Sequence, residues 1–355
     1  MFEHPSSLGF KGLFERPDSV NQPLYVITPI FNTQRFRKRW DLYEKFQHYV
    51  KASGAILYTI ELAFGERQFA VTSANNPYHI QVRTGGNNGD RVGHELWTKE
   101  SLINLALTRL PPDWVYVAWI DADITFKRPD WVGETLQQLQ HYQVVQMFSQ
   151  AEQLDIKYEV LQTYLGFMYC YHNRQSENIP ALSLKSDYYY TVPKSSFPQN
   201  HSNKINMAYW HPGFAWAARR DALNSLGGLI DYAILGSADY FMAKALIGAF
   251  NTKVRDFNNL GVSGSRWFYE WQRRAETFIR RNVGYVSGGL THYWHGSRAK
   301  RRYKEREQIL IDCKYDPELD LIKNTDQIWQ LTERNLSLRD EIRKYFAQRD
   351  EDATS

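Results

Sequence analysis

The sequence contains few cysteines and no long apolar segment. Its 355 residues include only two cysteines, Cys170 and Cys313, too few for a disulfide framework or a four-ligand zinc site. No apolar run approaches the roughly 20 residues that span a bilayer, and the polar segment Met1–Pro23 lacks the apolar core of a signal peptide. These absences predict a protein without a membrane span, in a reducing, cytoplasmic compartment.

The sequence also lacks a strong charge of one sign and a glycine-rich phosphate loop. Lys plus Arg is 43 and Asp plus Glu is 39, an excess too small to indicate a nucleic-acid partner by itself. The segment TPIFNTQRFRKR, which follows the first apolar run, contains no glycine, and Gly85, Gly86 and Gly89 are not followed by Gly-Lys-Ser or Gly-Lys-Thr. This disfavours a nucleotidyltransferase that holds phosphate in such a loop.

What the sequence does contain is an alternation of apolar runs and helical periods. Leu24–Ile30 is a β-branched apolar run, Arg35–Val50 carries apolar residues at helical spacing, and Ala55–Leu62 predicts a second strand. Strand, helix and strand in this order indicate an α/β fold. We predict one domain over residues 1–315, with a mixed, mainly parallel sheet flanked by helices, and a helical extension over residues 316–355.

The remaining segments are assigned in the same way. Further helices are predicted at Leu96–Leu110, Thr135–Gln140, Asp221–Leu226 (before the glycine pair Gly227-Gly228), Ala238–Phe250 and Arg266–Arg281. Strands are predicted at Trp114–Ile120 and Val144–Phe148, and a short strand or a turn at Pro212–Ala217. Loops are predicted at Asn75–Asp90 and Gln175–Asn206.

Two carboxylates, Asp121 and Asp123, directly follow the most apolar strand, WVYVAWI. A nearly continuous apolar strand is typical of burial on both faces of a sheet, and open α/β sheets bind ligands at the carboxyl ends of their strands. Two like charges at such a place are costly unless a cation neutralises them. The pair therefore predicts a divalent metal that also holds a substrate diphosphate, against the alternative of a solvated pair beginning a loop.

Four segments, taken in order, resemble nucleotide-sugar glycosyltransferases of the GT-A fold. WVYVAWIDADITF resembles their DxD strand, and Trp97–Glu100 with Asn104 resembles the preceding helix of the β-1,4-galactosyltransferase-like group, where a basic residue and an asparagine face the donor. Trp210–Ala243 resembles the acceptor-side segment of that group and of family 2 transferases. His292–Gly296 lies where GT-A enzymes supply a histidine to the metal. Together these matches cover roughly residues 24–310.

The resemblance implies a catalytic base at Asp239. The family usually has Glu-Asp or Glu-Asp-Asp at this place, whereas here Gly236-Ser237-Ala238-Asp239 carries a single carboxylate. As a base, Asp239 would take the proton of the acceptor hydroxyl in an inverting displacement. An N-cap of the following helix is the alternative, and the two roles can coexist.

The resemblance also implies metal and donor ligands. Either His292 or His295 is a candidate, with His295 preferred because Gly296 beside it permits close approach of a phosphate; the predicted metal set is Asp121, Asp123 and His295. Imidazole favours Mn²⁺ over Mg²⁺. Residues expected at the donor, some of them to balance diphosphate charge, are Thr28, Pro29, Asn32, Arg35, Lys99, Asn104, Asp121, Arg298 and Lys300. For each cation, a solvated surface charge is the alternative.

The sequence thus predicts a glycosyltransferase, a hexosyl- or pentosyltransferase, that uses a nucleotide sugar (a UDP-sugar first) and an acceptor hydroxyl of a carbohydrate or glycoconjugate. Basic clusters at Ser297–Arg306, Arg273-Arg274 and Arg280-Arg281 leave open an acceptor in DNA, such as a hydroxymethylated base. A nucleotidyltransferase and a non-catalytic nucleic-acid-binding protein are further alternatives, although binding alone leaves the Asp121–Asp123 strand unexplained.

Overall fold

The computed structural model describes residues 22–85, 94–182, 190–191, 207–250 and 260–353. The expectation for the amino-terminal segment therefore lies almost wholly outside the described residues. So do most of the loop expected at Gln175–Asn206 and the end of the one expected at Asn75–Asp90.

The core of the protein is a seven-stranded sheet in the order β12-β6-β11-β4-β1-β2-β3. Neighbouring strands are parallel except for β11, which runs antiparallel to both β4 and β6. The strands are β1 (Leu24–Phe31), β2 (Ile56–Phe64), β3 (His79–Thr84), β4 (Tyr116–Ile120), β6 (Val144–Gln146), β11 (Ala215–Arg219) and β12 (Val283–Tyr285). The predicted α/β class, with a mixed and mainly parallel sheet, is confirmed.

A second sheet lies beside the carboxyl end of β4. It has six strands in the order β5-β13-β7-β8-β10-β9. These are β5 (Ile124–Phe126), β7 (Gln150–Leu154), β8 (Val160–Gly166), β9 (Tyr190–Thr191), β10 (Met207–His211) and β13 (Gly289–His292). In this sheet β5, which follows Asp123 directly, pairs antiparallel with β13 so that Ile124 lies opposite His292. The pairing brings the turn after β4 and the turn after β13 together.

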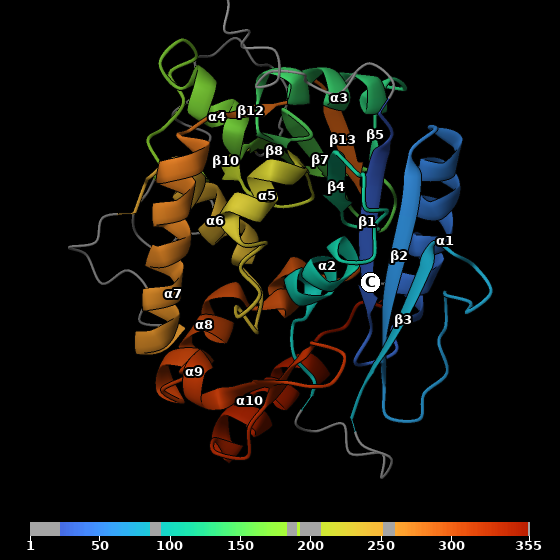
Figure 1. The fold of residues 1–355 in the computed structure, drawn as a ribbon, viewed down its shortest axis with the longest axis vertical. Helices are drawn as coiled ribbons and strands as arrows, with labels where there is room; N and C mark the ends of the chain where they lie inside the picture. Colours follow the sequence, from blue (N-terminus) through green and yellow to red (C-terminus); the bar gives the residue numbers. More distant parts are fainter. Residues whose placement is uncertain (1–21, 86–93, 183–189, 192–206, 251–259, 354–355) are drawn as a thin grey trace, which may run out of the picture.

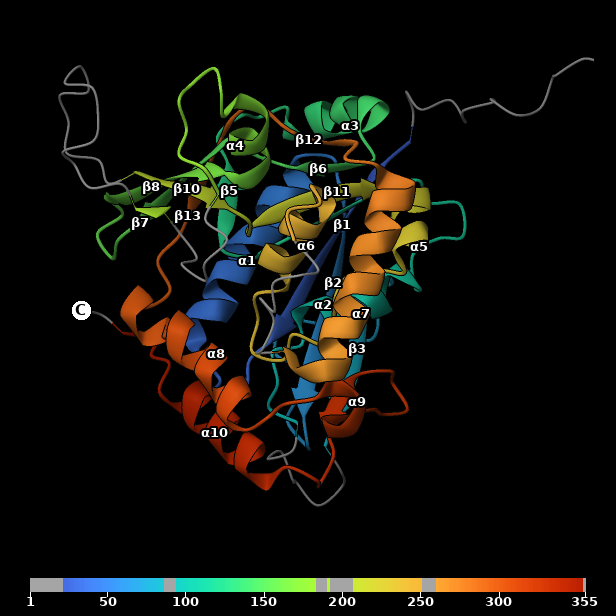
Figure 2. The same ribbon diagram turned by 90° about the vertical axis from the view of Figure 1, so that its left-hand side faces the viewer.

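Helices cover both faces of the main sheet (Figures 1 and 2). Alternate residues of β1 point to opposite faces: Leu24 and Val26 pack with α1 (Arg37–Ala52) and α3 (Trp131–His141), whereas Tyr25 and Ile27 belong to a larger apolar cluster. That cluster includes residues of α2 (Lys99–Leu107), α4 (Phe167–Asn173), α5 (Arg220–Leu226), α6 (Ala238–Leu246), α7 (Gly261–Arg274) and the π-helical turn Ala275–Ile279.

The carboxyl-terminal segment packs at one end of the molecule, where Figure 1 shows α8 (Tyr303–Asp312), α9 (Pro317–Asp320) and α10 (Leu336–Ala347) together. The helical extension predicted after residue 315 also contains a hairpin of β14 (Leu321–Lys323) and β15 (Trp329–Leu331). The position of a domain boundary near residue 315 stays a prediction. Within the described ranges, none of the helices combines the length and apolar character that a bilayer span requires.

The prediction of a loop at Asn75–Asp90 is wrong for the middle of this segment. His79–Thr84 forms the edge strand β3, paired in parallel register with β2 through Thr59↔His79 to Phe64↔Thr84. The strand carries only a weak apolar signal because, of its six residues, just Val82 and Thr84 are buried. The asparagine and glycine residues on either side of HIQVRT favoured a loop in the sequence, so the short alternation of apolar and polar residues in this strand was not recognised.

Candidate metal and active site

A cavity of about 190 Å³ opens at the carboxyl edge of the main sheet. This volume is many times the 10–15 Å³ or so that one water needs, so the cavity has room for a small-molecule substrate. Its lining comes from many parts of the chain, among them the ends of β1 and β4, strands of the second sheet, the turn after β13, the first turns of α2 and α6, and the carboxyl-terminal region. Six residues with ionisable side chains that the sequence named as candidates lie in this lining: Lys99, Asp121, Asp123, Asp239, His292 and His295.

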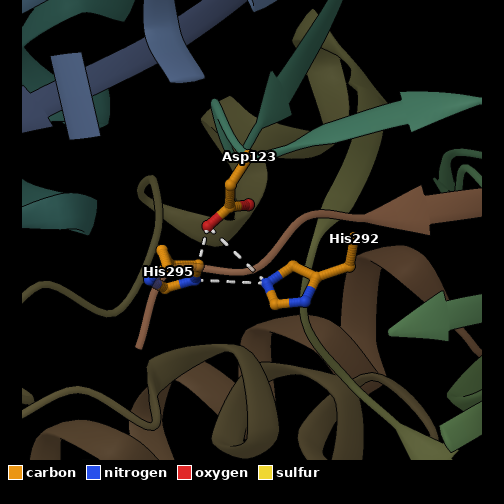
Figure 3. A group of neighbouring side chains, drawn as sticks. All are labelled: Asp123, His292 and His295. Carbon is orange, nitrogen blue, oxygen red and sulfur yellow. Dashed lines mark hydrogen bonds and ion pairs between the residues drawn. The ribbon is translucent and has the colours of Figure 1, made fainter. Parts of the chain in front are cut away.

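Asp123, His292 and His295 form the one cluster of possible metal ligands found among the described residues (Figure 3). The Asp123 Oδ2 atom lies 2.9 Å from His295 Nε2 and 3.6 Å from His292 Nε2, and the two Nε2 atoms are 3.3 Å apart. Ligands about 2.1 Å from one shared ion are expected at such separations. The three side chains therefore fit a single divalent cation.

The protonation states also fit a metal. Burial lowers the pKa of His292 to about 4, against the opposing charge of Asp123, so its ring is neutral at physiological pH. Although burial acts to raise the pKa of Asp123, the adjacent His292 and His295 hold it well below its usual value. The Asp123 Oδ1 atom is buried and has no hydrogen-bond partner among the described residues. A neutral imidazole and an ionised carboxylate are the forms that bind metal.

The register of the second sheet explains why these three residues meet. Tyr293 N donates to the Asp123 carbonyl at 2.9 Å, which extends the β5–β13 ladder by one step. His292 therefore sits beside Asp123, and the turn that follows returns His295 to the same point. The sequence alone preferred one histidine; the geometry gathers both.

Asp121 is placed differently from Asp123. Its Oδ1 atom forms an ion pair with Lys99 Nζ, from the first turn of α2. Burial acts to lower the pKa of Lys99, but the nearby carboxyl groups of Asp121, Glu100 and Asp239 together outweigh it, so the pKa of Lys99 is raised. Asp121 lies outside the three-residue ligand cluster. A role as a metal ligand would require it to give up or share the Lys99 contact.

Asp239 lies at the start of α6, with one carboxylate oxygen held and the other facing the cavity wall at Gly213. The Oδ1 atom accepts from Tyr240 N at 2.9 Å, and a Cβ atom placed on Gly213 would lie 2.8 Å from Oδ2. The N-cap of α6 is Ser237, in a left-handed conformation with φ of 80°. The capping position is thus taken by another residue, and Asp239 contributes to the cavity lining.

Glu100 is a further carboxyl group in the lining that the sequence analysis did not single out. It is 4% exposed, and burial raises its pKa to about 8, against the opposing charge of Lys99. The Trp-Thr-Lys-Glu segment was noted for its lysine, yet only the burial of α2 distinguishes its glutamate.

Four arginines line the cavity, and none was selected from the sequence: Arg39, Arg301, Arg306 and Arg349. Arg301 Nη2 lies 2.8 Å from His295 Nε2, and Arg306 Nη2 donates to Ser237 Oγ at 2.7 Å. By contrast Lys300, one of the expected phosphate ligands, is exposed. The side chain of Arg298, another of them, lies outside the described part of the chain. Arg301 and Arg306 do come from the basic segment that the sequence analysis noted.

The other residues expected at the donor divide between several places. Pro29 lines the main cavity, while Asn32 and Arg35 line a neighbouring cavity of about 400 Å³ that shares Ile30 with it. Thr28 is buried, and its hydroxyl donates to the Ile120 carbonyl at 2.9 Å. The remaining candidate, Asn104, holds the backbone of Leu229 through two hydrogen bonds of 2.8 and 2.9 Å.

Comparison with known proteins gives distant structural likenesses only. No protein-family model matches the sequence, and no curated protein matches it. The solved structures that resemble this chain include the following three. The first is a Drosophila β-1,4-galactosyltransferase 7 in complex with manganese, UDP-Gal and xylobiose (12% identity, 64% of this chain and 62% of that one covered, TM-score 0.29). The second is a Mycobacterium tuberculosis glucosyl-3-phosphoglycerate synthase in complex with Mn²⁺, UDP-glucose and phosphoglyceric acid (9% identity, 89% of this chain and 89% of that one covered, TM-score 0.33). The third is an Anaerococcus prevotii 4-diphosphocytidyl-2C-methyl-D-erythritol synthase (11% identity, 76% of this chain and 89% of that one covered, TM-score 0.31).

The chain thus spans less than two thirds of the length of the galactosyltransferase that it matches. At TM-scores near 0.3 these likenesses carry no argument about activity. Any functional conclusion rests on the geometry of the site itself.

Proposed function

We propose that this protein is a metal-dependent glycosyltransferase that moves a sugar from a nucleotide-sugar donor to an acceptor hydroxyl. The observation that carries the proposal is the cluster of Asp123, His292 and His295 at the end of a buried strand, inside a cavity that also holds Asp239. The cluster supplies a cation site and Asp239 supplies a base. Together they suit a reaction that expels a diphosphate and deprotonates an alcohol.

The cationic residues of the cavity support a diphosphate leaving group. A divalent ion held by Asp123, His292 and His295 would neutralise charge that develops on the diphosphate as the bond from the sugar carbon to oxygen breaks. Arg301 lies against His295, so its guanidinium is a cation available for the remaining charge. We assign the nucleoside to the neighbouring cavity lined by Asn32 and Arg35, which has Ile30 in common with the lining of the main cavity.

Asp239 is the proposed general base. As the acceptor oxygen forms its bond to the sugar carbon, its proton passes to the free Oδ2 atom, while Oδ1 keeps the hydrogen bond from Tyr240 N. The attack and the departure of the diphosphate occur in one step on opposite sides of the carbon, which inverts its configuration. UDP-sugars are the first donors to test.

The donor set favours Mn²⁺ over Mg²⁺ in this proposal. Two imidazoles and one carboxylate suit first-row transition metals, whereas Mg²⁺ prefers oxygen ligands. We therefore expect a chelator to stop transfer and Mn²⁺ to restore it best. Full activity in excess chelator would contradict the metal assignment.

A DNA acceptor has weaker support in the structure. Arg273, from one of the basic clusters, forms an ion pair with Glu270 at 2.8 Å. Arg266, on the same helix, forms an ion pair with Glu318 at 2.6 Å. Such pairing reduces the charge available to a phosphate backbone. A steep loss of acceptor affinity with added salt would favour DNA, and a flat response would count against it.

The first experiment is a thermal-shift screen of nucleotide sugars with and without Mn²⁺. A donor at about one hundred times its dissociation constant stabilises the native state by about 2.7 kcal/mol, and we expect this shift only when Mn²⁺ is present. The positive donor is then incubated with candidate acceptors, and the released product is identified. Nucleoside diphosphate indicates glycosyl transfer, whereas sugar 1-phosphate would indicate transfer of the nucleotidyl group and refute the proposal.

A further inference from the structure

The last described residues of the chain pack against the metal cluster. Asp352 caps the amino terminus of α1, accepting from Arg37 N at 2.9 Å and from Lys38 N at 2.8 Å. The carbonyl of Asp350 lies where a side chain at Gly296 would begin, and Gly296 has φ of 91°. A glycine beside His295 is thus required by the tail backbone, and not by an approaching phosphate as the sequence suggested.

Glu351, between these two anchors, is buried with two arginines. Its side chain is 3% exposed, and its carboxylate contacts Arg39 at 2.5 and 2.7 Å and Arg349 at 2.8 Å. Although burial acts to raise the pKa of Glu351, its contacts with Arg39 and Arg349 together hold it well below its usual value. Arg39 also donates to the Phe31 carbonyl at 2.7 Å, which ties this carboxylate to the end of β1.

The same carboxylate faces His295 on the side of the imidazole ring opposite Asp123. Glu351 Oε2 lies 3.6 Å from His295 Nδ1, while Nε2 of that imidazole faces Asp123 Oδ2 at 2.9 Å. A carboxylate facing Nδ1 favours the tautomer with its proton on Nδ1. The Nε2 atom then accepts from Arg301 Nη2 at 2.8 Å, and a bound cation would take the place of that contact. His292 differs, because its Nδ1 is buried without a hydrogen-bond partner among the described residues.

We propose that Glu351 is a positioning residue for the metal centre, fixing the tautomer and orientation of His295, and that the carboxyl-terminal tail is a wall of the active site. The inference rests on the proposed metal site and extends it to a residue more than fifty positions beyond His295. It predicts that metal affinity depends on a segment that supplies no ligand itself.

The test measures Mn²⁺ affinity of the full-length chain by electron paramagnetic resonance, without donor or acceptor. We expect Glu351→Gln to weaken Mn²⁺ binding by about 10–100-fold, the range typical of residues that orient a metal-bound histidine. Asp320→Asn is the matched control. Asp320 is also a buried carboxylate of the carboxyl-terminal segment, paired with Arg334 at 2.8 Å, but it does not line the cavity. Its Mn²⁺ affinity should match that of the unmodified chain.

A second readout separates positioning from simple loss of structure. In ¹⁵N spectra, His295 of the unmodified chain should be protonated at Nδ1, and Glu351→Gln should shift this tautomer balance. If Glu351→Gln does not fold, Glu351→Asp serves instead, because it keeps the negative charge near both arginines but withdraws the carboxylate from Nδ1. Weaker Mn²⁺ binding is expected there too.

Three outcomes would overturn the inference. These are Mn²⁺ affinity within about twofold of the unmodified chain in both Glu351 variants, an equal loss in Asp320→Asn, or no Mn²⁺ binding by the unmodified chain. The last would refute the proposed metal site as well, whereas the first two would leave the proposed function standing.

Discussion

Asp121 and Asp123 leave the same strand two residues apart, yet their side chains enter different surroundings. Asp123 faces two imidazoles, and its pKa is held well below the usual value. Asp121 faces a lysine, and burial raises its pKa although Lys99 acts in the opposite direction. A motif of paired carboxylates is therefore not a symmetrical metal clamp in this protein. One member contributes to the cation cluster and the other to an internal ion pair.

The largest expected effects come from replacing the two carboxylates one at a time, which tests whether their roles differ. We expect Asp123→Asn to reduce transfer by about a thousandfold or more and to abolish Mn²⁺ binding, because the only carboxylate of the ligand cluster is lost. Asp121→Asn should change Mn²⁺ affinity by less than about tenfold, since Asp121 is held by Lys99. Electron paramagnetic resonance and a transfer assay measure the two effects. Equal losses of Mn²⁺ binding would show that both carboxylates bind the metal.

Asp239 sharpens the comparison because its assigned role does not involve the metal. Asp239→Asn keeps the shape of the side chain and its contact with Tyr240 N but removes the basic oxygen. We expect turnover to fall by about 10²–10⁴-fold, with donor and Mn²⁺ affinities unchanged. Steady-state kinetics and donor titration separate these quantities. Normal turnover would reduce Asp239 to a structural residue of α6.

The smallest expected effect concerns Glu100, which follows Lys99 in the first turn of α2. Burial raises its pKa to about 8 in the folded protein, above the ordinary value of 4.5. The folded state therefore binds the proton more tightly, so this group's stabilising contribution is full at low pH and is lost as pH rises toward 8. Glu100→Gln should remove this dependence and raise the free energy of unfolding at pH 8.5 by on the order of 1–4 kcal/mol.

Denaturant unfolding of the metal-free protein at pH 5 and at pH 8.5 tests the prediction. The variant and the unmodified chain should differ less at pH 5 than at pH 8.5. Parallel stability profiles would show that Glu100 titrates normally and is not desolvated.

Much of the fold was predictable because it follows from local patterns. The last five residues of the run WVYVAWI form the fully buried strand β4, and the Gly227–Gly228 pair ends α5 in the left-handed conformation expected of a C-cap. The short edge strand β3 was missed because an edge needs little apolar surface. The strands β7 and β8 were missed as well. Their stability comes from pairing across the second sheet, which no local periodicity records.

By itself, the sequence determined that two carboxylates would leave a buried strand at the ligand-binding edge of an α/β sheet. The reason is that hydrophobic periodicity and the direction of parallel strands are local properties of the chain. Only the tertiary structure decided which carboxylate joins the cation cluster, that both His292 and His295 reach it, and that Glu351 lies behind one of them. Those choices depend on the register of β5 against β13 and on the contact between Arg39 and Glu351, 312 residues apart. Such pairings form between distant segments, so the spacing of neighbouring residues carries no record of them.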